Sequence, residues 1–296
     1  MKVTQNKVAF ARTASGSKPA LSLLVSVYNN TRFFDLVWAS INTQHFRDFE
    51  VVICDDGSND EVVQHVLDQT QHSLIPCTHC WHNDQGFRKN RILNCGVLAA
   101  SADYLVFIDG DCILHPRFLT EHAACKQAYA VLAGRRLELS EQISATLTPK
   151  LVGRGYLQRN LLRIMYAIRN QVGNNGSKGI YIRSAAIRAL RASKQGSVLG
   201  CNFSLHKSDL LNVNGFDTRY EGPGYGEDSD LELRLRVNEV RIVPFSNAAV
   251  QYHLWHRVQE RSTSNAHLYA EAVANARART LTGIAEQQRE EEAQHG

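Results

Sequence analysis

Short apolar runs alternate with amphipathic segments between Leu21 and Asp109. The apolar runs, rich in β-forming residues, predict strands at about residues 21–28, 49–54, 79–82 and 104–109. The segments between them predict helices at about residues 30–43, 59–70 and 87–100. Asn30 is placed to cap the first helix, and Asn59 or Asp60 the second. This alternation predicts an α/β fold with a mostly parallel, Rossmann-like sheet and helices on both faces.

The second half of the chain interrupts this alternation. Four apolar residues at helical spacing predict an amphipathic helix: Leu157, Leu161, Ile164 and Ile168. Residues 173–179 predict a loop, residues 200–205 a strand and residues 214–215 a turn. From about Asn265 we expect a polar, exposed helix that ends in the acidic residues 290–292.

Charge is unevenly distributed along the 296 residues, although the net charge is only +4. Residues 142–208 contain no Asp or Glu. The basic residues of this stretch are Lys150, Arg154, Arg159, Arg163, Arg169, Lys178, Arg183, Arg188, Arg191, Lys194 and Lys207. Such a one-sided segment indicates an anionic partner. Its few interleaved aromatic residues favour a membrane surface or an anionic acceptor over nucleic acid.

The seven cysteines are scattered and odd in number, and the polar N-terminus does not resemble a secretion signal. We therefore expect reduced thiols and a cytoplasmic protein. No apolar window approaches the roughly 20 residues of a membrane span, so any contact with the cytoplasmic membrane is expected at its inner surface. Cys77 and Cys80 are two residues apart, but no second such pair exists, so we interpret them as buried strand thiols rather than zinc ligands.

The candidate chemistry begins at Asp109-Gly110-Asp111, directly after an apolar strand. Two carboxylates held together repel each other unless a cation lies between them, and hard oxygen ligands suit Mg²⁺ or Mn²⁺. A solvated acidic turn is the alternative interpretation. Ligands of parallel α/β sheets bind beyond the carboxyl ends of the strands. There we expect Asp109 and Asp111 to meet the polar ends of two other strands, residues 28–29 and 55–56.

Two further clusters complete the candidate site. Glu227 and Asp228 follow a glycine-rich loop, and we favour one of them as a general base; an acidic helix start is the alternative interpretation. His253 and His256 flank a tryptophan and are candidate metal ligands. No P-loop motif is present, which argues against ordinary ATPase or GTPase chemistry. A cation, a base and polar strand ends suit sugar transfer from a nucleotide diphosphate, through a transition state resembling an oxocarbenium ion.

An ordered set of motifs between Leu21 and His256 resembles the GT-A-fold glycosyltransferases of family 2. The back half resembles the C-terminal region of galactosyltransferases, and the chain is similar to bacterial chondroitin-polymerase-type and lipopolysaccharide or capsule glycosyltransferases. The matching segments are residues 24–30, 52–58, 85–94, 107–111, 200–203, 214–217, 226–231 and 253–256. The resemblance implies a nucleotide-sugar-binding half (18–134), a basic helical insertion (135–199), an acceptor and catalytic half of the same domain (200–260) and a helical tail (261–296).

The resemblance also implies roles for individual residues. The nucleotide-sugar site would contain Val27, Tyr28, Asn30, Asp55, Asp56, Arg88, Arg91, Asp109, Gly110 and Asn202. The metal, Mn²⁺ or Mg²⁺, would be held by Asp111 with Asp109 and His256, and His253 is the alternative to His256. Asp228 would be the base, and Glu227 would contact the acceptor sugar. One departure is that Tyr225 is the only aromatic residue of a loop that is richer in tryptophan in galactosyltransferases.

From these observations we expect an inverting, metal-dependent hexosyltransferase. Its donor would be a UDP-sugar carrying galactose, glucose or an N-acetylhexosamine. Its acceptor would be a hydroxyl of a bacterial surface glycan, lipid-linked or part of a phosphorylated lipopolysaccharide core. The basic segment, residues 142–208, would contact that acceptor or the anionic membrane. The alternatives are a sugar nucleotidyltransferase, and a nucleotide-sugar- or glycan-binding protein without catalysis.

Overall fold

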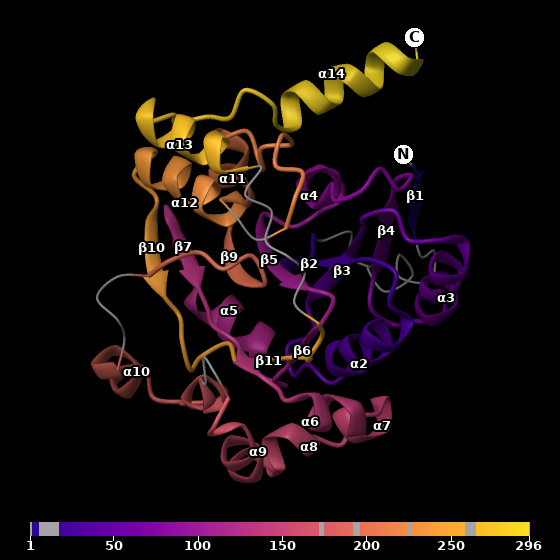
Figure 1. Ribbon diagram of the computed structural model, residues 1–296, viewed down its shortest axis with the longest axis vertical. Helices are drawn as coiled ribbons and strands as arrows, with labels where there is room; N and C mark the ends of the chain where they lie inside the picture. Colours follow the sequence, from indigo (N-terminus) through magenta and orange to yellow (C-terminus); the bar gives the residue numbers. More distant parts are fainter. Residues whose placement is uncertain are drawn as a thin grey trace.

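The computed structural model describes residues 2–5, 18–171, 175–191, 196–223, 226–257 and 265–295. The expectations for Tyr225 and for residues 173–174 lie outside this described part. Two sheets organise the fold, and the larger one has eight strands in the order β1-β4-β3-β2-β5-β9-β7-β10 (Figure 1). Helices cover both of its faces, as the sequence predicts.

The first half of the chain forms the predicted alternation. Its strands are β2 (Leu21–Val27), β3 (Phe49–Asp55), β4 (Cys77–Trp81) and β5 (Tyr104–Asp109). Its helices are α2 (Thr31–Asn42), α3 (Asp60–Thr70) and α4 (Lys89–Ala99). The side chains of Asn30 and Asn59 accept hydrogen bonds from the first turns of α2 and α3, so both predicted caps are confirmed. Because β2 is parallel to β3 and β5, and β3 to β4, these strands all end at one edge of the sheet.

The remaining strands extend this sheet on both sides. β9 (Asn202–His206) is antiparallel to both of its neighbours, β5 and β7 (Ala130–Ala133). Next to β7 lies the parallel β10 (Arg241–Pro244). At the other edge β1 (Lys2–Gln5) is antiparallel to β4. The alternating residues of β2 contact different core clusters, Leu23 and Val25 on one face and Leu24 on the other, so the sheet is buried on both faces.

A small second sheet lies at the carboxyl end of β5. It contains β6 (Cys112–Leu114), β11 (Gln251–His253) and β8 (Leu137–Glu138), with β11 in the middle. In this sheet His253 is paired with both Cys112 and Glu138. Segments more than 100 residues apart in the chain therefore meet just beyond the Asp109-Gly110-Asp111 turn.

Short helices form the lower part of Figure 1. They are α5 (Phe118–Cys125), α6 (Glu141–Thr146), α7 (Pro149–Gly153), α8 (Tyr156–Arg159), α9 (Leu161–Ile168), η1 (Gly176–Gly179) and α10 (Ala185–Arg191). The predicted amphipathic helix is thus two helices that meet at Asn160, and residues 176–179 form a 3₁₀ turn rather than a loop. Leu157, Ile164 and Ile168 are buried, as their spacing predicts.

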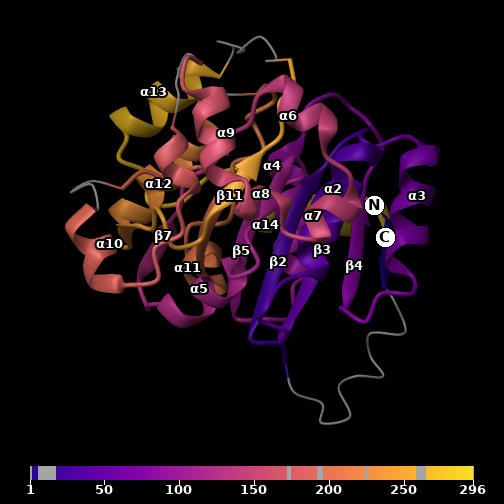
Figure 2. The same cartoon turned by 90° about the horizontal axis from the view of Figure 1, so that it is seen from below.

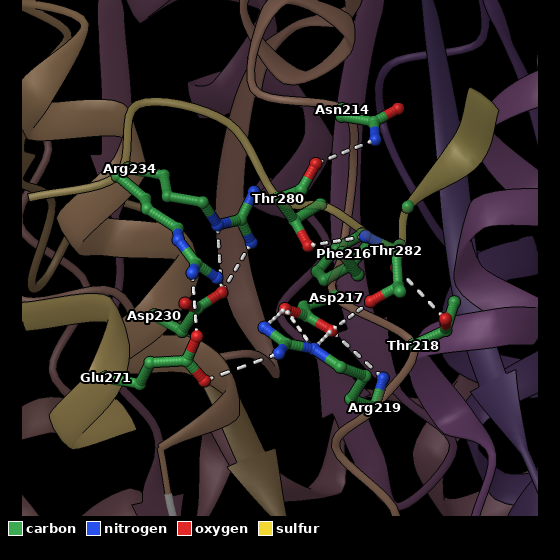
Figure 3. Close-up of polar contacts among 12 residues, drawn as sticks. Asn214, Phe216, Asp217, Thr218, Arg219, Asp230, Arg234, Glu271, Thr280 and Thr282 are labelled. Atoms are coloured by element: carbon green, nitrogen blue, oxygen red, sulfur yellow. Dashed lines mark hydrogen bonds and ion pairs between the residues drawn. The ribbon is translucent and has the colours of Figure 1, made fainter. Parts of the chain in front are cut away.

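The C-terminal part contains α11 (Lys207–Asn212), α12 (Glu227–Val237), α13 (Ala266–Ala274) and α14 (Ile284–His295). The single exposed tail helix is therefore a wrong prediction, because the tail forms two helices and Ile284 and Gln287 are buried. Figure 3 shows the polar network under this tail: Thr282 donates a hydrogen bond to Asp217, and Arg219 forms an ion pair with the same carboxylate. Among the described residues, no helix combines the length and apolar character needed to cross a bilayer.

Candidate active site

A cavity of about 490 Å³ opens at the carboxyl ends of β2 and β5. Eight of the residues expected to bind the nucleotide sugar or the metal line it: Val27, Tyr28, Asn30, Asp56, Asp109, Gly110, Asp111 and His256. They follow different strands but lie at one edge, because the strands are parallel and in register. Gly110 packs so closely on β2 that a Cβ would lie 2.6 Å from the carbonyl oxygen of Ser26. The structure therefore brings most of the predicted strand-end residues together.

Asp55 and Asp56 have different environments. Asp55 is fully buried, where it accepts a hydrogen bond from the Ser58 backbone N–H at 2.8 Å and lies 3.1 Å from His79 Nε2. Asp56 lines the cavity, lies 2.8 Å from His82 Nε2 and accepts a bond from the Arg88 backbone N–H. The Asp55 carboxylate orders the turn after β3, which leaves Asp56 as the acid of this pair that faces a ligand.

Asp109 and Asp111 also separate, although only Gly110 lies between them. Asp109 ends β5, and its Oδ1 accepts hydrogen bonds from Ser26 Oγ at 2.9 Å and Lys89 Nζ at 2.7 Å. Asp111 lies in the turn before β6 and faces the histidines of the second sheet. In a continuous strand, residues 109 and 111 would point to the same side. The strand ends at Asp109, so the two carboxylates point apart and each has its own set of partners.

Asp111, His253 and His256 form a group whose ligand atoms lie within 4.8 Å of one another. The Nε2 atoms of His253 and His256 lie 3.1 and 3.2 Å from Asp111 Oδ2. Burial alone would lower the pKa of His253, but its hydrogen bonds to Asp111 and Glu138 raise it to about 9. Both histidines reach the same carboxylate, whereas Asp109 lies outside the group. One carboxylate and two imidazoles are a donor set that suits a divalent transition metal.

A second layer of side chains orients this group. His253 Nδ1 lies 2.5 Å from Glu138 Oε2, and Arg136 Nε donates to Glu138 Oε1 at 2.7 Å. A carboxylate behind an imidazole fixes the tautomer and turns the other ring nitrogen towards a metal. Glu138 and Arg136 were missed from the sequence, because their only signal is their position in β8 and directly before it, and the pairing of β8 with β11 is not visible in the sequence.

The start of α12 brings Asp228 against Gly200, which lies just before β9. Asp228 Oδ2 accepts a hydrogen bond from the Gly200 backbone N–H at 2.7 Å, and a Cβ on Gly200 would lie 2.5 Å from Oδ1. Burial raises the pKa of Asp228 above its usual range. Burial also raises the pKa of Glu227 to about 7, although Lys89 opposes this effect. Glu227 Oε2 is buried and has no hydrogen-bond partner within the described part of the chain.

Lys89 connects the two acidic clusters and was given no role from the sequence. It lines the cavity beside Asp109. Burial would lower the pKa of its ammonium group, but the carboxylates of Asp109, Glu227 and Asp228 raise it. Lys89 is therefore a positive charge held close to three carboxyl groups. Its signal in the sequence is weak, because it stands between two arginines that we had expected to have the basic role.

Three of the expected nucleotide-sugar residues are engaged elsewhere. Arg88 forms an ion pair with Glu221 at 3.3 Å, and Arg91 with Glu290 of α14 at 2.9 Å. Asn202 is buried and donates to the backbone carbonyls of Arg135 and Ala249. The structure thus brings Lys89, rather than either arginine, to the cavity wall.

Comparisons with known proteins identify the family of this chain. A family model described as glycosyl transferase family 2 matches residues 22–186, and one described as the N-terminal domain of galactosyltransferase matches residues 183–257. The chain is 30% identical over 128 residues to validoxylamine A glucosyltransferase of Streptomyces hygroscopicus subsp. jinggangensis, covering 40% of this chain and 29% of that protein. It is 25% identical over 103 residues to chondroitin synthase of Escherichia coli, covering 34% and 15%. The matches span less than a third of these relatives' lengths.

Solved structures show the same fold. Residues 1–349 of S. aureus TarS in complex with UDP-GlcNAc match with a TM-score of 0.57 and 16% identity, covering 92% of this chain and 69% of that one. The mannosyltransferase PcManGT from Pyrobaculum calidifontis, in complex with GDP-Man and Mn²⁺, matches with a TM-score of 0.54 and 15% identity, covering 88% and 65%. The architecture is therefore that of the GT-A glycosyltransferases. The family model for glycosyl transferase family 2 covers more than half of this chain, so the chain belongs to that family.

Proposed function

We propose that the protein is an inverting, metal-dependent glycosyltransferase that moves a hexose from a UDP-sugar to a glycan hydroxyl. One observation carries this proposal: a single cavity is lined by Asp111 and His256 of the metal-capable group and by Lys89, whose pKa is raised by the nearby carboxyl groups of Glu227 and Asp228 at the start of α12. A cation-binding group and a base are the two requirements of displacement at a sugar carbon bonded to diphosphate.

The residues at the strand ends would bind the nucleotide. Val27, Tyr28, Asn30 and Asp56 lie along one wall of the cavity, and the Tyr28 hydroxyl donates to Asp84 at 3.1 Å. We assign the base and ribose to this wall, and the diphosphate to the stretch between Asp111 and Lys89. In that position the Lys89 ammonium would neutralise part of the diphosphate charge.

Asp111, His253 and His256 would hold the metal, with Glu138 fixing the orientation of His253. Two imidazole donors favour Mn²⁺ over Mg²⁺, which prefers oxygen ligands. When bound, the metal supplies the positive charge that stabilises the departing diphosphate.

Asp228 would take the proton of the acceptor hydroxyl, whose oxygen attacks the anomeric carbon as the bond to UDP breaks. One base and direct displacement lead to inversion of configuration. The raised pKa of Asp228 brings this carboxylate closer to the working range of a general base. Glu227, its neighbour on α12, would contact the acceptor sugar.

The acceptor, in this proposal, is a bacterial surface glycan that is lipid-linked or phosphorylated, reached from the cytoplasmic side of the membrane. The segment that would meet it carries 11 basic residues and no acid. Opposite charge draws such a segment to phosphate-bearing lipids.

A panel of nucleotide sugars tests the function. The protein is incubated with Mn²⁺ and each of UDP-glucose, UDP-galactose, UDP-GlcNAc, UDP-GalNAc and GDP-mannose, the last because a structural neighbour binds it. Release of nucleoside diphosphate is measured with and without glycan acceptors. We expect one UDP-sugar to be consumed, with product of opposite anomeric configuration by NMR.

Three results would contradict this proposal. A retained anomeric configuration would remove the role of Asp228. Binding of a nucleotide sugar or a glycan without turnover of any nucleotide sugar would favour the non-catalytic binding protein. Consumption of sugar phosphate and nucleoside triphosphate would favour a nucleotidyltransferase.

A further inference from the structure

The outward face of α9 combines apolar and basic side chains. Leu162 is 83% exposed and Tyr166, one turn further along, is 66% exposed. Because they are four residues apart on a helix, they lie next to each other. The opposite face of α9 is buried through Ile164 and Ile168, so α9 anchors itself with one side and presents the other.

Arginines surround these two residues. Arg159, at the end of α8, Arg163 and Arg169 fall on the same side of the helical stretch, and all are exposed. The Arg169 guanidinium lies 3.7 Å from the centroid of the Tyr166 ring. No Asp or Glu within residues 142–208 offsets their charge. A scattered surface leucine needs no explanation, but a leucine and a tyrosine enclosed by three arginines form a defined patch.

A second helix at the same end of the molecule repeats the combination. This helix is α10, which lies to the left of α9 in Figures 1 and 2. On α10, Leu190 is 87% exposed and Ile187 50% exposed, and Arg183 precedes the helix. Arg188 is different, because it forms an ion pair with Glu121 at 3.3 Å and so belongs to the fold. The exposed Ile187 and Leu190 of α10 are therefore free of the ion pair that holds the helix in place, and Arg183 just before the helix is exposed beside them in the sequence.

We propose that the outward face of α9, assisted by α10, docks on an anionic phospholipid surface. Leu162 and Tyr166 enter the interface between headgroups and acyl chains, while Arg159, Arg163 and Arg169 contact lipid phosphates. A basic helix with exposed leucine and aromatic residues is typical of segments that lie in a membrane surface. The proposal deepens the membrane contact in the proposed function, but docking is measured without any sugar transfer.

The packing behind α9 fixes this face relative to the candidate metal site. Gly179 of η1 lies between β8 and α9. A Cβ at this position would be 2.3 Å from Leu137 Cδ1 of β8 and 3.0 Å from Leu161 Cδ1 of α9. Leu137 precedes Glu138, which contacts His253. A close-packed interior of this kind does not slide, so docking through α9 would hold the cavity at a constant position above the lipid.

Vesicle binding tests the proposal on the full chain. Co-sedimentation is measured with vesicles of phosphatidylcholine alone and with about one third phosphatidylglycerol, at low and high salt. We expect binding only to the anionic vesicles, weakened by salt. Arg163→Glu and Leu162→Ser should each lower the partition coefficient by roughly tenfold, since each removes a charge contact or an inserted leucine. The matched controls, Arg289→Glu and Leu281→Ser, replace an arginine 74% exposed by side chain and a leucine 59% exposed, both outside the basic segment.

Several results would overturn the docking surface. The proposal is wrong if the wild-type protein does not co-sediment with anionic vesicles at low salt. Equal losses in the controls would indicate a response to net charge alone. A loss with Arg163→Glu but none with Leu162→Ser would indicate a solvated basic face that attracts soluble anions. Unchanged circular dichroism spectra are expected for all four variants, because the replaced residues are exposed. Vesicle binding without consumption of any nucleotide sugar would contradict the proposed function and leave docking intact.

Discussion

Replacement of Glu227 by glutamine should alter how the stability of the protein depends on pH. Burial raises the pKa of Glu227 from 4.5 to about 7 in the folded state. Between these two values the unfolded chain has released the proton and the folded protein keeps it. Unfolding then releases a proton, so the free energy of unfolding falls as the pH rises from about 4.5 to 7.

The size of the effect follows from the two pKa values. A difference between 4.5 and 7 corresponds to about 3 kcal/mol at 1.36 kcal/mol per pH unit. Glu227 is partly exposed, and solvent reduces this figure, so we expect about 2 kcal/mol. Glu227→Gln lacks the titrating group. Between pH 5 and pH 8 its free energy of unfolding should therefore fall by about 2 kcal/mol less than that of the wild type.

Urea unfolding in metal-free buffer at pH 5 and pH 8 measures the difference. Glu61→Gln is the matched control, because Glu61 is an exposed first-turn glutamate of α3 as Glu227 is a first-turn glutamate of α12. The control should follow the wild type at both pH values. Parallel pH profiles for the wild type and Glu227→Gln would refute the inference that Glu227 is desolvated beside Lys89 and Asp228.

Three further predictions concern the metal group and the C-terminal network. Asp111→Ala should lower turnover by at least about tenfold more than Asp109→Ala, because only Asp111 belongs to the metal-capable group; initial rates with saturating donor and Mn²⁺ measure this, and equal losses would contradict it. Glu138→Gln should weaken Mn²⁺ binding in calorimetry by about 10- to 100-fold, since it removes the acceptor that orients His253, whereas Glu141→Gln, on the exposed start of α6, should not. Arg234→Met should lower the free energy of unfolding by about 3–5 kcal/mol, because it leaves Asp230 buried without its partner. The addition of Asp230→Asn should restore much of this loss. If the double variant is no more stable than Arg234→Met, the packing of Arg234 dominates instead.

The first half of the fold was predictable because its signals are local. Leu21–Val27 and Tyr104–Asp109 are apolar runs, and an asparagine marks the start of each of the first two helices. Cys77 and Cys80 lie in β4 and are buried, and burial raises the pKa of their thiols, which agrees with the interpretation of buried strand thiols. Each of these features depends on a few neighbouring residues that a sequence displays directly.

The tail was less predictable, because its structure depends on contacts with residues far away in the sequence. Residues 284–295 look like an exposed polar helix, and only contact with distant residues buries Ile284 and Gln287. The side chain of Gln287 donates to the carbonyl of Arg91, nearly 200 residues earlier. That contact also explains why Arg91, which resembles a nucleotide-binding arginine by position, forms an ion pair with Glu290 instead.

The Asp109-Gly110-Asp111 triplet illustrates where a motif stops being sufficient. Its two carboxylates are equivalent by spacing, but Asp109 is the last residue of β5 in the larger sheet, and Asp111 directly precedes β6 in the smaller one. The first sheet gives Asp109 the partners Ser26 and Lys89. The second gives Asp111 the two histidines, because β11 pairs beside β6. Lys89 already neutralises Asp109, and its raised pKa keeps that ammonium group protonated. The imidazoles beside Asp111 can instead release their protons and bind a metal, so a cation at this edge gains more from Asp111.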